Sequence, residues 1–215
     1  MNSTPTSRAV PGDELGPPHP MLVIISGPSG VGKDTIIAAL EERRHLPPYH
    51  YVVTCTTRAR RLGEIDAVSY NFLTVEQFLA IRDAGELLEA NEVHGNWYGT
   101  PRAGVRSALA RRQHAILKID VQGAQVIKGL VPEALLIFVV PPSLETLFHH
   151  LRDRRTESAD QLEVRQRNAA LELARKDEYD YVVLNEEDRV DRTAERIEAI
   201  ITHEERRESR RPVTV

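Results

Sequence analysis

The stretch MLVIISGPSGVGKDTIIAA, residues 21–39, decides the fold. Its apolar start, residues 21–25, predicts a short buried strand, and its apolar-periodic end predicts a helix. Between them lies GPSGVGK at residues 27–33. A strand, a G-x-x-x-x-G-K loop and a helix in this order are typical of a phosphate-binding P-loop. An ordinary structural turn is the alternative, but the flanking strand and helix supply the context that the motif requires.

The chemistry of such a loop comes mainly from its backbone. Its glycines allow a curl that points successive N–H groups inward, so that these donors, the helix N-terminus and the Lys33 ammonium converge on a polyphosphate. One position departs from the pattern, because Asp34 stands where Ser or Thr usually follows the lysine. The residues expected to bind this polyphosphate are Gly27, Pro28, Ser29, Gly30, Val31, Gly32, Lys33, Asp34 and Thr35.

Length and composition limit the possible classes of fold and function. The chain has 215 residues, of which 41% are hydrophobic and 28% charged, which suits one elaborated globular domain or two small lobes. A formal charge of -4 gives no basis for a general nucleic-acid or membrane role. The longest apolar run, residues 134–140, is far shorter than the roughly 18 residues that span a bilayer. Cys55 is the only cysteine, which fits a reducing cytoplasm, and nothing indicates an oligomeric state.

The order of elements predicts the architecture. Residues 1–20 are rich in Pro, Ser, Thr and Gly, and we expect a disordered tail. Apolar strands alternating with helices beyond it predict a parallel α/β sheet. Residues 54–99 differ, because they contain a loop, a hairpin and one helix, and they predict an inserted β-rich lobe. Strands are expected at 21–25, 49–55, 69–73, 86–93, 97–98, 115–120, 134–140 and 181–184, with helices between most of them.

Local signals place two helix starts. Thr74, with Gln77 three residues later, forms a capping-box pattern, and Gly85 is expected to end that helix. Thr100 followed by Pro101 predicts an N-cap and a first helical residue, for a helix that runs to about residue 112.

Two features of the 54–99 lobe have chemistry of their own. The sequence TCTTRARR, residues 54–61, gathers hydroxyls and guanidiniums, and a guanidinium fork binds phosphate bidentately. A solvated basic loop is the alternative, which the loop taken alone favours. Glu89 lies in an otherwise apolar strand, so its carboxylate either faces solvent or points into a pocket. A buried carboxylate needs donors, and the Watson–Crick edge of guanine offers N1–H and the exocyclic amine.

The conjunction of motifs resembles the guanylate kinase family. GPSGVGK matches the family's P-loop, TCTTRARR its arginine loop, and DAVSYNF, residues 66–72, its tyrosine segment. EANEVHGNWYGT, residues 89–100, IDVQGA, residues 119–124, and RRTE, residues 154–157, follow in order at the family's spacing. The resemblance implies a P-loop parallel sheet flanked by helices, a nucleoside-monophosphate-binding lobe and a helical lid. It divides the chain into a core (21–53, 100–142 and 170–209), a lobe (54–99) and a lid (143–169).

The resemblance also implies an ATP-dependent phosphorylation of GMP, and of dGMP, to the diphosphate in purine nucleotide metabolism. ATP and Mg²⁺ would take part with GMP. Asn185 would lie near the adenine, Asp34 and Asp120 near magnesium, and Arg154 and Arg165 over the transferring phosphoryl group. The catalytic residues would be Lys33, Arg58, Arg154 and Arg165. The GMP-binding residues would be Thr54, Arg58, Arg61, Tyr70, Glu89, Tyr98, Thr100 and Asp120.

Three positions depart from the family's pattern. Asp34 replaces the P-loop hydroxyl, and Lys118 stands where the family often has a second acid. Their opposite charges suggest that the two side chains pair with each other. His150 stands where many relatives have a lid arginine, and Arg152 is the alternative substitute.

Two other functions stay open at this point. A ribose-bisphosphate-type kinase would keep the P-loop and the lid but would not need Glu89 beside Thr54 and Thr100. An inactive guanylate-kinase-like module that binds phosphopeptides would lose the P-loop lysine, which this chain keeps as Lys33.

Overall fold

The computed structural model describes residues 19–45, 47–93, 95–152, 159–207 and 211–215. Of the expected tail at residues 1–20, only the last two positions are among them. The elements in chain order are β1 (Leu22–Ser26), α1 (Lys33–Glu41), β2 (Tyr49–Tyr51), β3 (Cys55–Thr56), β4 (Asn71–Phe72), α2 (Val75–Asp83), β5 (Leu87–Val93), β6 (Asn96–Pro101), α3 (Arg102–Ala110), β7 (His114–Lys118), α4 (Val121–Leu130), β8 (Leu135–Val140), α5 (Leu144–Arg152), α6 (Ala159–Leu173), a 3₁₀ turn (Lys176–Glu178), β9 (Tyr181–Leu184) and α7 (Val190–Glu205).

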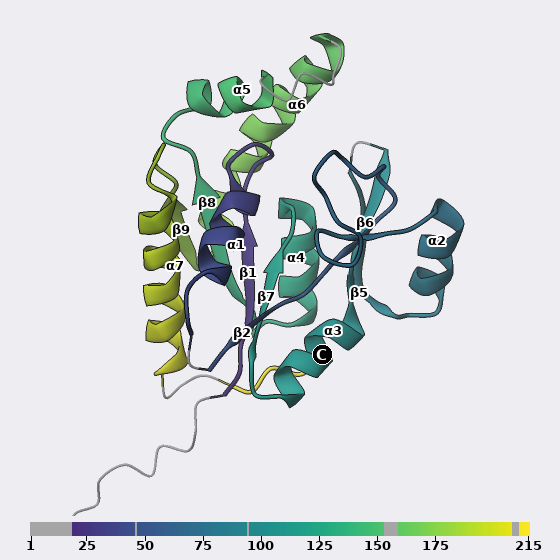
Figure 1. The fold of residues 1–215 in the computed structure, drawn as a ribbon, viewed down its shortest axis with the longest axis vertical. Coiled ribbons are helices and arrows are strands. Elements are labelled where there is room, and N and C mark those ends of the chain that lie inside the picture. The colour runs from purple at the N-terminus through teal and green to yellow at the C-terminus, as the bar shows by residue number, and fades with distance from the viewer. Residues whose placement is uncertain (1–18, 46, 94, 153–158, 208–210) are drawn as a thin grey trace, which may run out of the picture.

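The main sheet has five strands in the order β2-β7-β1-β8-β9, and every neighbouring pair is parallel. The helices α1 and α7 cover one face of this sheet, and α3 and α4 lie on the other (Figure 1). The predicted α/β P-loop class is therefore confirmed.

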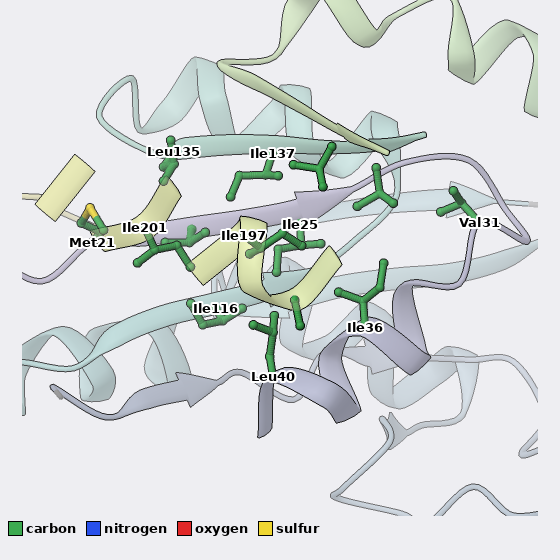
Figure 2. Packing of buried hydrophobic residues seen from close by; sticks show 14 of the residues in the cluster. Met21, Ile25, Val31, Ile36, Leu40, Ile116, Leu135, Ile137, Ile197 and Ile201 are labelled. Carbon is green, nitrogen blue, oxygen red and sulfur yellow. The ribbon is translucent and has the colours of Figure 1, made fainter. Parts of the chain in front are cut away.

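Strand β1 is the centre of the core because both of its faces are covered. Val23 and Ile25 pack into the cluster with α1 and α7, where Ile36, Leu40 and Ile197 are also buried (Figure 2). Leu22 and Ile24 alternate to the opposite face and pack with residues of α3 and α4. Each fully buried aliphatic side chain of this kind contributes about 1.5–3 kcal/mol. This packing holds the carboxyl end of β1, from which the P-loop starts.

Glycine is required where β1 turns into the loop. A side chain at Gly27, which has a φ of 147°, would place its Cβ 2.4 Å from the carbonyl oxygen of Val139. Gly32 forms the N-cap of α1 with a left-handed φ of 92°. The loop therefore curls as predicted, and α1 begins at Lys33.

A second sheet of four strands, in the order β4-β3-β6-β5, forms the β-rich part of the chain. Strands β5 and β6 pair antiparallel as the predicted hairpin. A small core of Cys55, Phe78 and Leu87 packs beneath this sheet. The capping box of α2 is present, because the Gln77 N–H donates to Thr74 Oγ1 at 3.1 Å and the Thr74 N–H donates to Gln77 Oε1 at 2.9 Å.

Two sequence predictions are wrong in detail. The single strand expected at 49–55 is divided, with β2 in the main sheet and β3 in the second. Thr100 is not a helix cap but a residue of β6, opposite Glu89, and α3 is preceded by Pro101 without a side-chain cap. The Thr100 hydroxyl is instead engaged by the Glu89 carboxylate. A local Thr-Pro pattern cannot show that a strand extends through it.

The helices α5 and α6 project beyond the carboxyl edge of the main sheet, above the P-loop (Figure 1). Arg154, expected to act in this region, lies outside the described residues. None of the helices in the described ranges has the length and apolar content of a bilayer-spanning segment.

Candidate active site

One cleft of about 1330 Å³ lies between the P-loop, the second sheet and α6. The predicted site residues that line it are Gly27, Ser29, Gly30, Val31, Gly32, Lys33, Asp34, Thr35, Thr54, Arg58, Arg61, Tyr70, Tyr98, Asp120, Arg165 and Asn185. Pro28, Glu89 and Thr100 are not among its lining residues, and Glu89 and Thr100 are buried. The fold thus brings the two halves of the predicted site, far apart in sequence, to one cavity.

Lys33 lies inside the curl of the P-loop. Its Nζ donates to the carbonyl oxygens of Gly27 at 2.6 Å and Pro28 at 3.1 Å. Burial lowers the pKa of Lys33, while the carboxylates of Glu172 and Asp34 oppose that shift. A buried ammonium of this kind gains from an anionic ligand, because the ligand replaces the water that the ammonium has lost.

The helix α6 is tied to the P-loop through Ser29. Arg165 donates from Nη2 to Ser29 Oγ at 2.8 Å, and the Ser29 N–H donates to Glu172 Oε2 at 3.1 Å. Burial raises the pKa of Glu172, and the neighbouring Lys33 opposes this shift. Sequence reasoning found Arg165 but missed Glu172. The available signal was their spacing of seven residues, which places both on one face of a helix.

Two further side chains contact the P-loop. Asn185 donates from Nδ2 to the Val31 carbonyl oxygen at 2.9 Å and accepts from the Thr193 hydroxyl at 2.9 Å. His150 Nδ1 lies 3.2 Å from the carbonyl oxygen of Gly30. His150 lines the cleft, whereas Arg152 is exposed and does not. Of the two alternatives at this position, His150 therefore faces the site.

The arginine loop presents Arg58 beside two tyrosines. The Arg58 guanidinium donates to both oxygens of Glu64, at 2.7 and 3.1 Å, and its Cζ lies 5.5 Å from the centre of the Tyr70 ring. The rings of Tyr70 and Tyr98 meet edge to face with centroids 6.2 Å apart. Glu64, which the sequence analysis did not single out, thus holds Arg58 in place.

Glu89 forms a buried polar centre behind the cleft. Its Oε1 accepts from the Thr100 hydroxyl at 2.7 Å, its Oε2 accepts from Asn91 Nδ2 at 2.6 Å, and the residue is 5% exposed. Burial raises the pKa of Glu89 to about 7, although the hydrogen bonds from Thr100 and Asn91 oppose the shift. The helix α4 approaches closely, since a Cβ at Gly123 would lie 3.3 Å from Glu89 Oε2. Of the alternatives for Glu89, the solvent-facing one is excluded.

Asp34 and Lys118 form an ion pair, as their charges suggested, in which Lys118 Nζ donates to Asp34 Oδ1. Burial would lower the pKa of Lys118, but Tyr70 and Asp34 outweigh it and the pKa is raised. Asp120 caps α4, accepting at Oδ1 from the N–H groups of Gln122 and Gly123 at 2.8 and 3.0 Å.

The site offers few protein ligands for a magnesium ion. The described part of the chain holds no cluster of three or more His, Cys, Asp or Glu side chains that could bind a metal. Mg²⁺ usually needs only one or two protein carboxylates when substrate phosphates and waters complete its shell. Asp34 and Asp120 both line the cleft, so the cleft offers that number of carboxylates.

Comparison with known proteins identifies the family. The guanylate kinase family model matches residues 19–204. The guanylate kinase of Carboxydothermus hydrogenoformans is 41% identical over 184 residues, which cover 86% of this chain and 88% of the relative. Guanylate kinase 2, chloroplastic/mitochondrial, of Oryza sativa subsp. japonica is 40% identical over 200 residues, covering 93% of this chain and 70% of that protein.

A solved structure agrees as well. The crystal structure of guanylate kinase from Anaplasma phagocytophilum superimposes with a TM-score of 0.71 at 31% identity, covering 89% of each chain. The motifs, the cleft and these comparisons together show that the chain belongs to the guanylate kinase family.

Proposed function

We propose that this chain transfers the γ-phosphoryl group of ATP to GMP, and to dGMP, giving ADP and the corresponding diphosphate. The observation that carries the proposal is that one cleft has a polyphosphate loop on one side and Arg58, Arg61, Tyr70 and Tyr98 on the other. A donor phosphate and an acceptor phosphate would therefore meet in it. The reaction would serve purine nucleotide metabolism in the cytoplasm, a compartment that fits a chain whose one cysteine is a free thiol.

The residues of this chain act by positioning and charge. The acceptor is an ionised phosphate, so that no general base is needed and catalysis rests on alignment and neutralisation. Lys33 and the loop N–H groups hold the donor phosphates, Arg58 and Arg61 the acceptor, and Arg154 and Arg165 the transferring group. Residues 54–99 serve as the lobe and residues 143–169 as the lid, whose closure excludes water. Bound Mg²⁺, with Asp34 and Asp120 as its protein ligands, would neutralise charge on the phosphates.

Guanine selectivity would come from Glu89. The carboxylate accepts from the guanine N1–H and exocyclic amine, with Thr54 and Thr100 beside it. AMP presents an acceptor at N1 and has no amine at C2, so it would place an acceptor against the buried carboxylate and supply neither of the two donors that guanine offers. A site of this type rejects an analogue that lacks the donor by about 10⁴–10⁵. The buried Glu89 also disfavours the ribose-bisphosphate-type kinase, because the substrate of such a kinase has no base that could donate hydrogen bonds to Glu89.

The test is a coupled assay of ADP formation with ATP, Mg²⁺ and one acceptor at a time: GMP, dGMP, AMP or a ribose bisphosphate. Turnover with GMP and dGMP, and little with the other two, is the expected result. A preference for the sugar phosphate would overturn the proposal in favour of the other kinase. Absence of turnover with every acceptor, together with phosphopeptide binding, would favour the inactive module, although the retained Lys33 argues against it.

A further inference from the structure

Lys118 is a cation of the cleft to which the family resemblance gives no role. It is the last residue of β7, at the carboxyl edge of the main sheet, beside the strand that leads into the P-loop. Its side chain is 21% exposed and lines the cleft. Its Nζ bonds to Asp34 and lies 5.1 Å from the centre of the Tyr70 ring. Lys118 therefore contacts the donor half and the acceptor half of the site at once.

We propose that Lys118 is a further phosphate-binding residue of this chain, which binds the acceptor phosphate of GMP, and that Asp34 orients it. The inference rests on the proposed function, because it takes GMP as the acceptor. It assigns one joint role to Asp34 and Lys118, two of the three positions at which this chain departs from its family's pattern.

Proximity to Tyr70 supports this role. Arg58, the residue expected to bind the acceptor phosphate, has its Cζ 5.5 Å from the Tyr70 ring centre. The Lys118 ammonium is 5.1 Å from the same centre. An ammonium carries three donors, and the bond to Asp34 uses one of them. The bond to Asp34 therefore leaves two of the three donors for phosphate oxygens.

For Asp34 itself, the fold gives little reason to form the pair. The side chain of Asp34 is 75% exposed, and a carboxylate so well hydrated gains little from an ion pair. Its location gives a better reason. Asp34 directly follows Lys33, so an uncompensated carboxylate there would repel the polyphosphate. Lys118 neutralises that charge, and Asp34 in turn holds the ammonium at the boundary between the two phosphates.

The test compares binding of GMP with binding of guanosine, which lacks the phosphate. Affinities are measured calorimetrically without ATP or magnesium for the wild type, Lys118→Met, Lys118→Arg and Lys128→Met. Lys128 is a matched control, since its ammonium pairs with Asp180 at 3.1 Å and its side chain is 30% exposed outside the cleft. Circular dichroism and thermal unfolding verify that each variant folds.

We expect Lys118→Met to weaken GMP binding about tenfold to hundredfold, which corresponds to one charge-assisted hydrogen bond. Guanosine binding should stay within about twofold, because no phosphate contact is lost. Lys118→Arg should recover most of the GMP affinity, and Lys128→Met should match the wild type. Equal losses for GMP and guanosine, or no loss for either, would overturn the assignment. A wild type that neither binds nor turns over GMP would instead contradict the proposed function itself.

The role of Asp34 is tested by a double-mutant cycle. An orienting residue acts through Lys118, so Asp34→Asn should change GMP affinity in the wild type and have a much smaller effect in Lys118→Met. Additive effects of the two substitutions would remove Asp34 from this role and leave Lys118 as the phosphate-binding residue.

Discussion

The buried carboxylate of Glu89 should make GMP binding depend on pH in a way that the structure specifies. The pKa of this carboxylate in the free protein is about 7, and burial is the main cause of the increase. Only the ionised form can accept from both the N1–H and the exocyclic amine of guanine, so a proton must leave before the base binds. Affinity should therefore fall about tenfold between pH 8 and pH 6, because the ionised fraction falls by that factor.

Guanosine separates this effect from the titration of the nucleotide's own phosphate, whose second pKa is about 6. Titration calorimetry at pH 7 in buffers of different ionisation enthalpy should detect the release of about half a proton on binding. The Glu89→Gln variant should bind guanosine weakly and without proton release. If the wild type releases no proton, or if the variant keeps the same pH slope, Glu89 does not read the base.

The same titration predicts an unusual effect on stability. The pKa of Glu89 in the folded protein lies above its value of 4.5 in the unfolded chain. The favourable contribution of Glu89 to the free energy of unfolding is therefore complete below pH 4.5 and is lost as the pH rises through 7. At pH 8 the ionised side chain therefore costs about 3 kcal/mol relative to a group with an ordinary pKa. Glutamine can accept from Asn91 and donate to the Thr100 hydroxyl without that cost.

Glu89→Gln should consequently raise the unfolding free energy in urea at pH 8 by up to about 3 kcal/mol, while the gain shrinks towards zero as the pH approaches 4.5. A variant that is stabilised equally at pH 8 and pH 5, or destabilised at both, would refute the assigned pKa. A gain in stability together with a loss of GMP selectivity would identify Glu89 as a residue kept for function.

Three further substitutions test the donor half of the site. Lys33→Ala should lower kcat about 10³-fold or more with the thermal unfolding midpoint little changed, and a retained kcat would contradict the P-loop assignment. Asp34→Ser should keep turnover but shift the magnesium concentration for half-maximal rate, whereas an unchanged magnesium profile would place Asp34 away from the metal. Glu172→Ala removes the acceptor of the Ser29 N–H, and should raise the KM for ATP about tenfold while the KM for GMP stays near the wild-type value; equal changes in both constants would argue against a local role in the P-loop.

The parts of this molecule that could be predicted are those that depend on residues close together in the sequence. The P-loop is one example, because an apolar strand, spaced glycines and a lysine follow one another within residues 21–39. The capping box at Thr74 and the hairpin between β5 and β6 are others. Asp34 and Lys118 are 84 positions apart in the sequence, yet their opposite charges at two unusual positions were enough to suggest that they pair.

The parts that were missed depend on tertiary contacts. Glu172 lies on a largely polar helix, and its value as a carboxylate acceptor appears only when Ser29 is beside it. Glu64 lies in a loop of mixed charge, where nothing local shows that it holds the Arg58 guanidinium. The Thr100 hydroxyl was assigned to a helix cap because the partner that engages it, Glu89, comes from another strand. Such errors concern polar groups, whose partners are directional and remote, whereas burial patterns repeat along the chain.

Three cations that line the cleft already have polar partners within the protein. Lys33 donates to loop carbonyls, Arg58 to Glu64, and Lys118 to Asp34. At Lys33 and Arg58 the binding of anionic substrates is therefore largely an exchange of partners, which limits the gain in affinity but leaves the cations in place before the substrates arrive. Since phosphoryl transfer relies on alignment and on charge that needs no reorganisation, this arrangement favours turnover over tight binding. The arrangement also predicts that removal of an internal anion such as Glu64 would make the Arg58 side chain less well positioned. This loss should outweigh any gain in the affinity of Arg58 for GMP.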